Sequence, residues 1–285
     1  MIVQSQISKL SNRLFKEQGG RRIPEAVLER DYCIAWFLVG LSKVPLCKKL
    51  AFKGGTSLKR IHFADYRFSE DLDFSLLDET LSFNELKAQL EPLYEVVKKD
   101  SNVVFRFSRE DSQSHQNCFT FYLAYEGPLP TTSQVKEMKV DITIKELIVE
   151  KLQSFPVLVS YPEYAGIPTD AKITAYSLSE IAIEKTVALM DKARSEPRDL
   201  YDLWFLTEQS GQVDLTECVS GVECKLRHRG KTLKEVQGEF GRKEARLNKT
   251  WELRLSTQMN SLPEFDGVYR AVKRNLRRAR ITTES

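Results

Sequence analysis

Two aspartates separated by a single residue, Asp71 and Asp73, are the feature of this sequence best suited to chemistry. They lie in the stretch Glu70-Asp71-Leu72-Asp73-Phe74, where polar and apolar residues alternate as they do in a β-strand. Since alternate side chains of a strand share one face, both carboxylates point the same way, and the leucine and phenylalanine face a core. Two carboxylates side by side on a rigid strand form a hard oxygen site, which suits Mg²⁺ or Mn²⁺.

A glycine-rich segment precedes the aspartates and could hold the phosphates of a nucleotide. Glycines allow backbone N–H groups to approach a triphosphate closely, and the start of a helix adds the positive end of its dipole. Lys53 admits two interpretations, a phosphate contact or a charge at the end of a strand. We predict a nucleotide-binding segment that comprises Lys53, Gly54, Gly55, Thr56 and Ser57.

A third carboxylate, Asp141, could complete a metal site. Two-metal sites for phosphoryl and nucleotidyl transfer hold the ions roughly 4 Å apart, commonly with three carboxylates. Asp141 alternates with apolar residues on a predicted strand over residues 138–144, on the same face as Lys139. We predict that Asp141 binds metal together with Asp71 and Asp73. A D-x-D pair alone is often structural, and it is the preceding Gly-Gly-Thr-Ser that makes the pattern specific.

A second group of charged residues lies on two predicted helices. Lys185 shares a helix face with apolar residues one turn away, so its stem can pack while its ammonium reaches a phosphate. Asp199 and Asp202, three residues apart, face the same way, and Arg198 is spaced to pair with Asp202. The alternative interpretation is a pair of helices joined by salt bridges, without a catalytic role.

The elements that must position these residues change in type along the chain. Apolar periodicity predicts helices over residues 23–44, 56–62 and 83–99, and strands over 50–53, 71–76, 103–107, 118–125 and 138–144. From residue 177 the pattern is helical, over 181–190, 197–206, 215–226, 233–259 with interruptions, and 265–280. Prolines and a glycine near residues 161–169 indicate a boundary. We therefore predict an α+β domain over residues 1–165 and an all-helical domain over residues 166–285.

Composition narrows the class of protein. The 285 residues are 41% hydrophobic and 29% charged, as in globular proteins, with no run of eighteen apolar residues for a membrane span. The first residues do not resemble a signal peptide. Five cysteines without C-x-x-C spacing argue against a zinc site and favour a reducing compartment. We therefore expect a cytoplasmic protein with no membrane association, and any metal must be held by carboxylates.

Positive charge is concentrated near the C-terminus. Residues 225–280 contain sixteen Lys/Arg against six Asp/Glu, although the net charge of the whole chain is only +3. Five of these basic residues follow helical spacing and form one stripe: Arg270, Lys273, Arg274, Arg277 and Arg278. Such a stripe suits the phosphates of a nucleic acid, most simply RNA. The other interpretation is that these are ordinary solvated helix faces.

The motifs together resemble the AbiEii/AbiGii family, the nucleotidyltransferase toxins of bacterial toxin–antitoxin and abortive-infection systems. Four motifs carry the resemblance, in order and at sensible spacing over residues 51–206: Lys53-Gly54-Gly55-Thr56-Ser57-Leu58, Phe68-Ser69-Glu70-Asp71-Leu72-Asp73, Lys139-Val140-Asp141, and Glu184-Lys185 with Arg198-Asp199-Leu200-Tyr201-Asp202-Leu203. Outside this span only the helical character is similar.

The resemblance implies a DNA polymerase β-like nucleotidyltransferase domain with a mixed sheet, followed by a helical C-terminal domain. It implies Mg²⁺ (or Mn²⁺), an NTP donor, a cognate antitoxin and, as in some members, a tRNA 3′ end as acceptor. By motif match, Gly55 and Ser57 contact phosphates, Asp71 and Asp73 bind metal, and Lys185 and Asp202 are essential for catalysis. The match of Asp141 is looser, because some relatives place a different acidic residue there.

Three other functions use the same residues. An NTP-dependent phosphotransferase acting on a protein or small molecule needs the same metal site and phosphate cradle. A nucleotide- or RNA-binding module without turnover is the non-enzymatic alternative, which the set Asp71, Asp73, Lys185 and Asp202 argues against. A nuclease is disfavoured, since no histidine accompanies the carboxylates.

Overall fold

Residues 1–112, 117–130 and 134–283 are described by a computed structural model. The chain forms two units, the first from Met1–Glu146 and Leu152–Tyr176 and the second from Leu147–Lys151 and Ser177–Ser285. The change of unit at Tyr176 differs from the boundary that we predicted after residue 165. The reason is a short strand just before Tyr176, which pairs with the sheet of the first unit.

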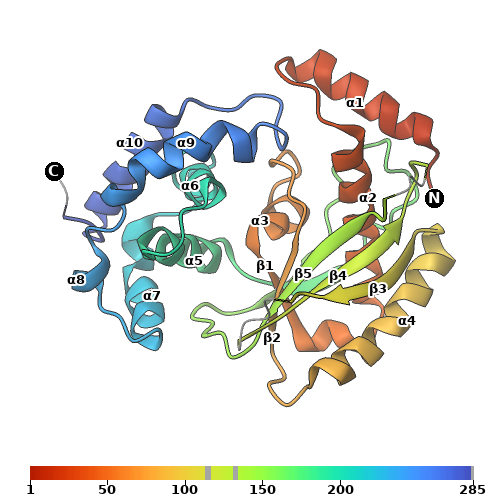
Figure 1. The fold of residues 1–285 in the computed structure, drawn as a ribbon, viewed down its shortest axis with the longest axis horizontal. Coiled ribbons are helices and arrows are strands. Elements are labelled where there is room, and N and C mark those ends of the chain that lie inside the picture. Colours follow the sequence, from red (N-terminus) through yellow and green to blue (C-terminus); the bar gives the residue numbers. More distant parts are fainter. Residues whose placement is uncertain (113–116, 131–133, 284–285) are drawn as a thin grey trace. The chain divides into compact units, whose positions relative to one another are not determined.

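A seven-stranded mixed sheet organises the first unit (Figure 1). Its spatial order is β3-β4-β5-β2-β1-β7-β6, in which β1–β7 and β2–β5 are parallel and the other neighbours are antiparallel. The strands are β1 (Leu50–Lys53), β2 (Leu72–Leu76), β3 (Val104–Glu110), β4 (Cys118–Glu126), β5 (Glu137–Thr143), β6 (Gln153–Pro156) and β7 (Lys172–Ala175). The central position of β2 places its residues between β5 and β1.

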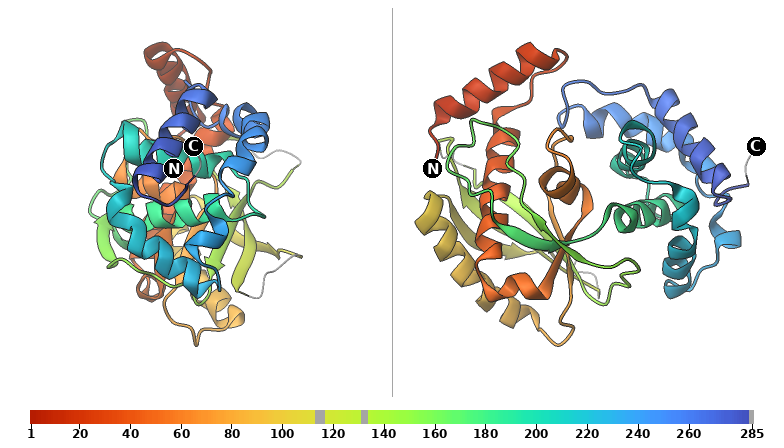
Figure 2. Two further views of the ribbon diagram at one scale, coloured as in Figure 1. Left: turned by 90° about the vertical axis from the view of Figure 1, so that its left-hand side faces the viewer. Right: turned by 180° about the vertical axis from the view of Figure 1, so that it is seen from behind.

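Helices cover the apolar face of this sheet. The helices of the first unit are α1 (Gln4–Gln18), α2 (Glu25–Ser42), α3 (Gly54–Ser57) and α4 (Phe83–Ser101). Phe37 of α2 packs edge-on against Phe105 with ring centroids 5.5 Å apart, and Phe83 of α4 lies 5.7 Å from Phe121. The view from behind in Figure 2 shows α2 and α4 on the same side of β3, β4 and β5. The opposite face, which carries Asp73 and Asp141, is thereby left for polar side chains.

The predicted elements of the first unit agree with the structure at most positions, but β3 extends three residues beyond its predicted end, to Glu110. The predicted helix over residues 56–62 begins earlier, at Gly54, and its second half, Leu58–His62, is a wider π-helical turn. The polar N-terminal stretch, whose helical periodicity is weak in sequence, forms α1. Strands β6 and β7 were also missed, because each is only four residues long and they flank the stretch 161–169 in which prolines indicate a boundary.

From residue 177 on, the described part of the second unit consists of helices and connecting turns, as predicted. Its helices are α5 (Leu178–Met190), α6 (Pro197–Trp204), α7 (Leu215–His228), α8 (Leu233–Val236), α9 (Glu244–Leu255) and α10 (Phe265–Arg278). Helix α6 is central and contacts α5, α9 and α10. The predicted interruptions of residues 233–259 are real, because a 3-10 turn at Gly241–Lys243 separates α8 from α9. Among the described helices, none combines the length and the apolar character that crossing a membrane requires.

Glu180 connects residues 147–151 to the helices of the second unit. The Ser177 hydroxyl accepts a hydrogen bond from the N–H of Glu180 at 3.1 Å and so caps α5. The carboxylate of Glu180, however, accepts hydrogen bonds from the N–H groups of Val149 and Glu150 and pairs with buried Lys225 at 2.8 Å. Glu180 therefore ties residues 147–151 to this unit.

Candidate active site

Strand register places charged residues in one row across the first unit's sheet. Lys53 of β1 lies opposite Asp73 of β2, and Asp73 lies beside Asp141 of β5. Thr120 of β4 is the next residue in the row and donates a hydrogen bond to Asp141 Oδ1 at 2.6 Å. Residues paired across strands share a face, so these four side chains lie together on the face away from α2 and α4.

A second row runs beside the first on the same face. The pairing of Leu72 with Val140 puts Asp71 next to Lys139, and Lys139 is in turn paired with Tyr122 of β4. The Nζ atom of Lys139 donates to Asp141 Oδ2 at 2.7 Å. Burial acts to lower the pKa of Lys139, but the Asp141 hydrogen bond and the charges of Asp141 and Asp71 outweigh it and raise the pKa. The structure thus brings Asp71, Asp73 and Asp141 onto neighbouring positions, as the sequence predicts.

The chemistry of Asp71 and Asp73 fits a divalent cation. Both side chains are only partly buried, and both offer the oxygen ligands that Mg²⁺ and Mn²⁺ prefer. A Cβ atom added to Gly54 would lie 2.4 Å from Asp73 Oδ2, so the glycine backbone and the carboxylate are held close together.

Asp141 is less available as a metal ligand, because its carboxylate already accepts hydrogen bonds. Both of its carboxylate oxygens already accept hydrogen bonds, from Thr120 and from Lys139. Within the described ranges, no three Asp, Glu, His or Cys side chains are arranged to hold a metal ion. The prediction that Asp141 is a third ligand therefore requires Lys139 to release it.

The two glycines of the glycine-rich segment are required for different reasons. Gly54 has a positive φ of +77°, a backbone conformation that residues other than glycine rarely adopt. At Gly55 there is no room for a side chain, because a Cβ there would lie 2.6 Å from the guanidinium of Arg67. Arg67 is itself buried, and sequence reasoning missed it because no motif distinguishes it from other arginines.

The other three residues of the predicted nucleotide-binding segment, Lys53, Thr56 and Ser57, are all buried. The Thr56 hydroxyl donates to Ser69 Oγ at 2.9 Å and to the carbonyl oxygen of Asp71, so Thr56 ties α3 to the start of β2. Ser57 is completely buried, and its hydroxyl has no hydrogen-bond partner in the part of the chain that the structure describes. Lys53 lies 3.6 Å from Glu146 and over the ring of Tyr176.

The second predicted group forms an ion cluster within the helical unit. The ammonium of Lys185 lies 2.8 Å from Asp199 and 2.7 Å from Asp202, so the two aspartates face one way as predicted. Both aspartates are buried, whereas Lys185 retains 12% of its side-chain exposure. Arg198 forms an ion pair with Glu196 at 3.2 Å. Of the four residues that we predicted as catalytic, two thus lie in each unit.

Arg194 completes the cluster around Asp199. Its guanidinium donates from Nε to Asp199 Oδ2 at 2.6 Å and from Nη2 to Oδ1 at 3.2 Å. Burial acts to raise the pKa of Asp199, but the charges of Lys185 and Arg194 outweigh it and hold the pKa well below its usual value. Asp199 is therefore the ionised centre of this cluster.

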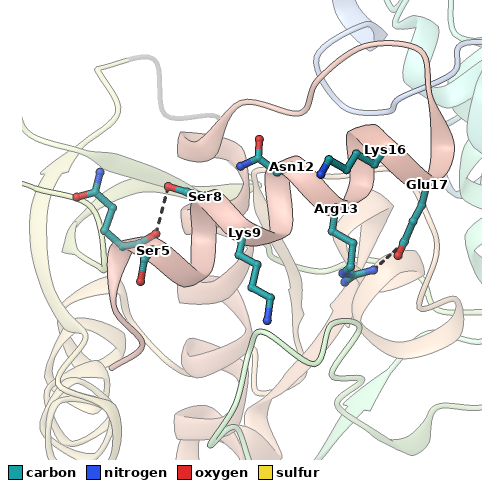
Figure 3. A pocket seen from close by; sticks show the side chains of 8 residues that line it. Ser5, Ser8, Lys9, Asn12, Arg13, Lys16 and Glu17 are labelled. Carbon is teal, nitrogen blue, oxygen red and sulfur yellow. Dashed lines mark hydrogen bonds and ion pairs between the residues drawn. The ribbon is translucent and has the colours of Figure 1, made fainter.

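A surface hollow along α1 contains none of the predicted site residues. All of its lining comes from one face of this helix, and Figure 3 shows the ion pair between Arg13 and Glu17 within it. A concave binding site usually gathers side chains from several elements. The hollow is therefore not the predicted nucleotide site.

Replacing Asp199 by asparagine tests the ion cluster through pH. The ionised form of Asp199 stabilises the fold above the ordinary carboxyl pKa of about 3.9, and this contribution is lost as pH falls below that value. Loss of one partner of a buried ion pair costs about 3 kcal/mol. We expect Asp199→Asn to lower the free energy of unfolding by about that amount at neutral pH and by little in strong acid.

Urea titrations across pH measure this difference, with the exposed Asp170→Asn as the control. A difference that stayed constant from neutral pH to strong acid would contradict the ionised state assigned to Asp199.

Comparison with known proteins places the chain in a family. The family described as "Nucleotidyl transferase AbiEii toxin, Type IV TA system" matches residues 36–271. No protein of curated function matches the sequence. Among solved structures, JHP933 from Helicobacter pylori is 16% identical, with a TM-score of 0.55 over 90% of this chain and 93% of its own.

The nucleotidyltransferase toxin MenT4 from Mycobacterium tuberculosis is 14% identical, with a TM-score of 0.57 over 98% of this chain and 97% of its own. At such identities these two structures show the fold alone, and that fold agrees with the predicted α+β domain followed by helices. The family match covers most of the sequence, and its type IV toxin–antitoxin assignment implies an NTP substrate and an antitoxin partner. The chain belongs to the AbiEii family of nucleotidyltransferase toxins.

Proposed function

We propose that this nucleotidyltransferase toxin transfers an NMP group from an NTP to the 3′ end of a tRNA, with Mg²⁺ or Mn²⁺ bound by Asp71 and Asp73. The observation that carries the proposal is the charged row on the sheet face opposite α2 and α4, where Asp73 lies against the Gly54 backbone. The row combines a carboxylate pair and a glycine-rich helix start, which are the two parts that nucleotidyl transfer requires. Five free cysteines are compatible with the reducing cytoplasm in which tRNA is found.

The reaction exchanges one phosphorus–oxygen bond for another. The 3′ oxygen of the acceptor forms a bond to the α-phosphorus, the bond from that phosphorus to the bridging oxygen breaks, and pyrophosphate leaves while the hydroxyl loses its proton. A bound divalent cation would supply charge neutralisation at the phosphates. The Gly54 and Gly55 backbone orients the donor phosphates, and Ser57 offers a hydroxyl that lacks a partner in the described chain.

Lys185 and Asp202 are proposed as further residues of the reaction. A compact ammonium suits one phosphate oxygen, and the buried carboxylates of Asp199 and Asp202 fix its position. Asp141 is proposed as a third metal ligand that Lys139 covers when no cation is bound.

Helix α10 is proposed as the surface that grips the acceptor. Its predicted basic stripe is largely exposed, but two of its arginines form ion pairs, Arg274 with Glu208 at 2.8 Å and Arg278 with Asp214 at 3.0 Å. In the described chain, neither Arg270 nor Arg277 pairs with an acidic side chain, so these two should contribute most to phosphate binding.

The transferred group distinguishes this proposal from its main alternative. Purified protein is incubated with Mg²⁺, total tRNA and each NTP labelled in turn at the α- or γ-phosphate. Nucleotidyl transfer moves label to tRNA from the α position only. Label arriving from the γ position, on any acceptor, would show a phosphotransferase instead.

The carboxylate pair is tested by Asp71→Ala and Asp73→Ala. Each variant should lower transfer to background, because the metal loses a ligand, while the free energy of unfolding without metal stays the same or rises as carboxylate repulsion is relieved. The exposed Asp65→Ala is the control for loss of a nearby negative charge. Near-normal turnover in either active-site variant would refute the metal assignment.

Lys185 is tested by replacement with alanine and with arginine. We expect Lys185→Ala to lower the rate about 10²- to 10³-fold, the usual cost of losing one donor to transition-state charge. Lys185→Arg should recover stability but not full rate, because a planar fork does not replace a compact ammonium. Unfolding curves of both variants separate catalysis from loss of the ion cluster, and full activity in Lys185→Ala would make this cluster a scaffold.

The acceptor surface is tested by charge reversal. The double variant Arg270→Glu/Arg277→Glu should bind tRNA more weakly and lower the slope of log K against log salt by about 2, one for each lost phosphate contact. The matched control reverses two exposed lysines at the end of α4, Lys98 and Lys99. An unchanged affinity and salt slope in the α10 variant would mean that the stripe is a solvated helix face.

A further inference from the structure

An arginine stacked on a tyrosine lies on the same sheet face as the carboxylates. The guanidinium carbon of Arg109 (β3) is 3.6 Å from the ring centroid of Tyr122 (β4), and the two residues are paired across the strands. We call these two residues the Arg–Tyr shelf. Its arginine keeps 51% of its side-chain exposure, so one face of the guanidinium meets solvent.

Neighbouring side chains fix the shelf in place. Glu137 of β5 holds the edge of the Arg109 guanidinium, with Nη2 to Oε2 at 2.9 Å and Nε within 3.3 Å of both carboxylate oxygens. The Ser108 hydroxyl donates to Glu137 at 2.6 Å, and the Tyr122 hydroxyl donates to Asp111 at 3.3 Å. Exposed ion pairs add little to stability, so the main effect of these contacts is to hold the guanidinium plane over the ring.

The Arg–Tyr shelf and the Gly54 segment lie on opposite sides of the carboxylates. The second row of the sheet runs from Asp71 through Lys139 to Tyr122, and the Gly54 cradle begins at the end of β1, beyond Asp73 in the opposite direction. With strands about 4.8 Å apart, Tyr122 is roughly 10 Å from Asp71 along the sheet. In an in-line transfer, the attacking and leaving groups occupy opposite sides of the reacting phosphorus. Donor phosphates at Gly54 therefore leave the shelf to the acceptor.

We propose that the Arg–Tyr shelf binds the terminal base of the RNA acceptor by stacking on the outer face of the Arg109 guanidinium. The proposal rests on the proposed function and specifies where its acceptor is held. Unpaired bases stack on guanidinium planes and aromatic rings, and such stacking tolerates different bases. The cations Arg109 and Lys139 complement the charge of the adjoining phosphate. A base held there leaves its sugar hydroxyl directed along the row toward Asp71.

The test measures binding without catalysis. The probe is a fluorescent RNA hairpin with a short single-stranded 3′ end, and anisotropy without NTP gives its Kd. Arg109→Lys keeps the charge but loses the plane, and Tyr122→Leu removes the ring beneath it. We expect each to raise Kd about tenfold, the usual scale for one stacked base. Tyr122→Phe, which keeps the ring and loses only the hydrogen bond to Asp111, should raise Kd much less than Tyr122→Leu does.

Two controls isolate stacking. Arg106→Lys changes a second exposed arginine of β3 that is also ion-paired, with Glu126, and should leave Kd unchanged. A hairpin with an abasic 3′-terminal nucleotide should bind the wild type about tenfold more weakly, and Tyr122→Leu should then cause no further loss.

An equal effect of Tyr122→Leu on intact and abasic hairpins would overturn the proposal, as would changes in unfolding free energy with no change in Kd. Failure to bind the hairpin at all would also overturn it and would point to a protein or small-molecule acceptor. None of these outcomes depends on turnover, so α-label transfer to tRNA can succeed while the shelf fails.

Discussion

The register of β2 between β1 and β5 is the constraint on which the rest of the site depends. It sets Asp73 directly beside Asp141, and like charges facing each other across strands destabilise a sheet. The structure offsets this repulsion with Lys53 on one side and with Lys139 and Thr120 on the other. A shift of the β2 register by one residue would turn these charged side chains toward the apolar core. The packing of buried Leu72 and Phe74 therefore determines the positions of the carboxylates as well as the fold.

The two charged clusters are built on different principles. The sheet cluster is partly exposed and sets the carboxylates of Asp71, Asp73 and Asp141 beside the cations Lys53 and Lys139. The helical cluster is buried, and Lys185 and Arg194 compensate Asp199 within the protein itself. Replacing a charged residue should therefore leave the free energy of unfolding unchanged or raise it in the sheet cluster, and lower it in the helical cluster. This difference distinguishes a site that binds a ligand from a cluster whose charges balance each other.

Much of this site could be predicted because strand alternation is local. The spacing of Asp71 and Asp73, and the inward turn of their apolar neighbours, follow from the two-residue period of a strand. Which of the two glycines has the positive φ could not be predicted, because both are the same residue type. They differ only in their neighbours in the fold, which are Asp73 for Gly54 and Arg67 for Gly55. Nor could the Arg–Tyr shelf, because it joins two strands whose register depends on a bulge in β3. Short β6 and β7 were missed since four residues carry too little pattern.

Direct titration with Mn²⁺ tests the central claim, that the Asp71 and Asp73 carboxylates form a cation site before any substrate binds. Paramagnetic resonance of free Mn²⁺ gives the number of bound ions and their affinity in wild type, in the double variant Asp71→Asn/Asp73→Asn, and in Asp65→Asn as control. The account predicts saturable binding by wild type and by the control, and its loss in the double variant. Equal Mn²⁺ binding by all three proteins would contradict it.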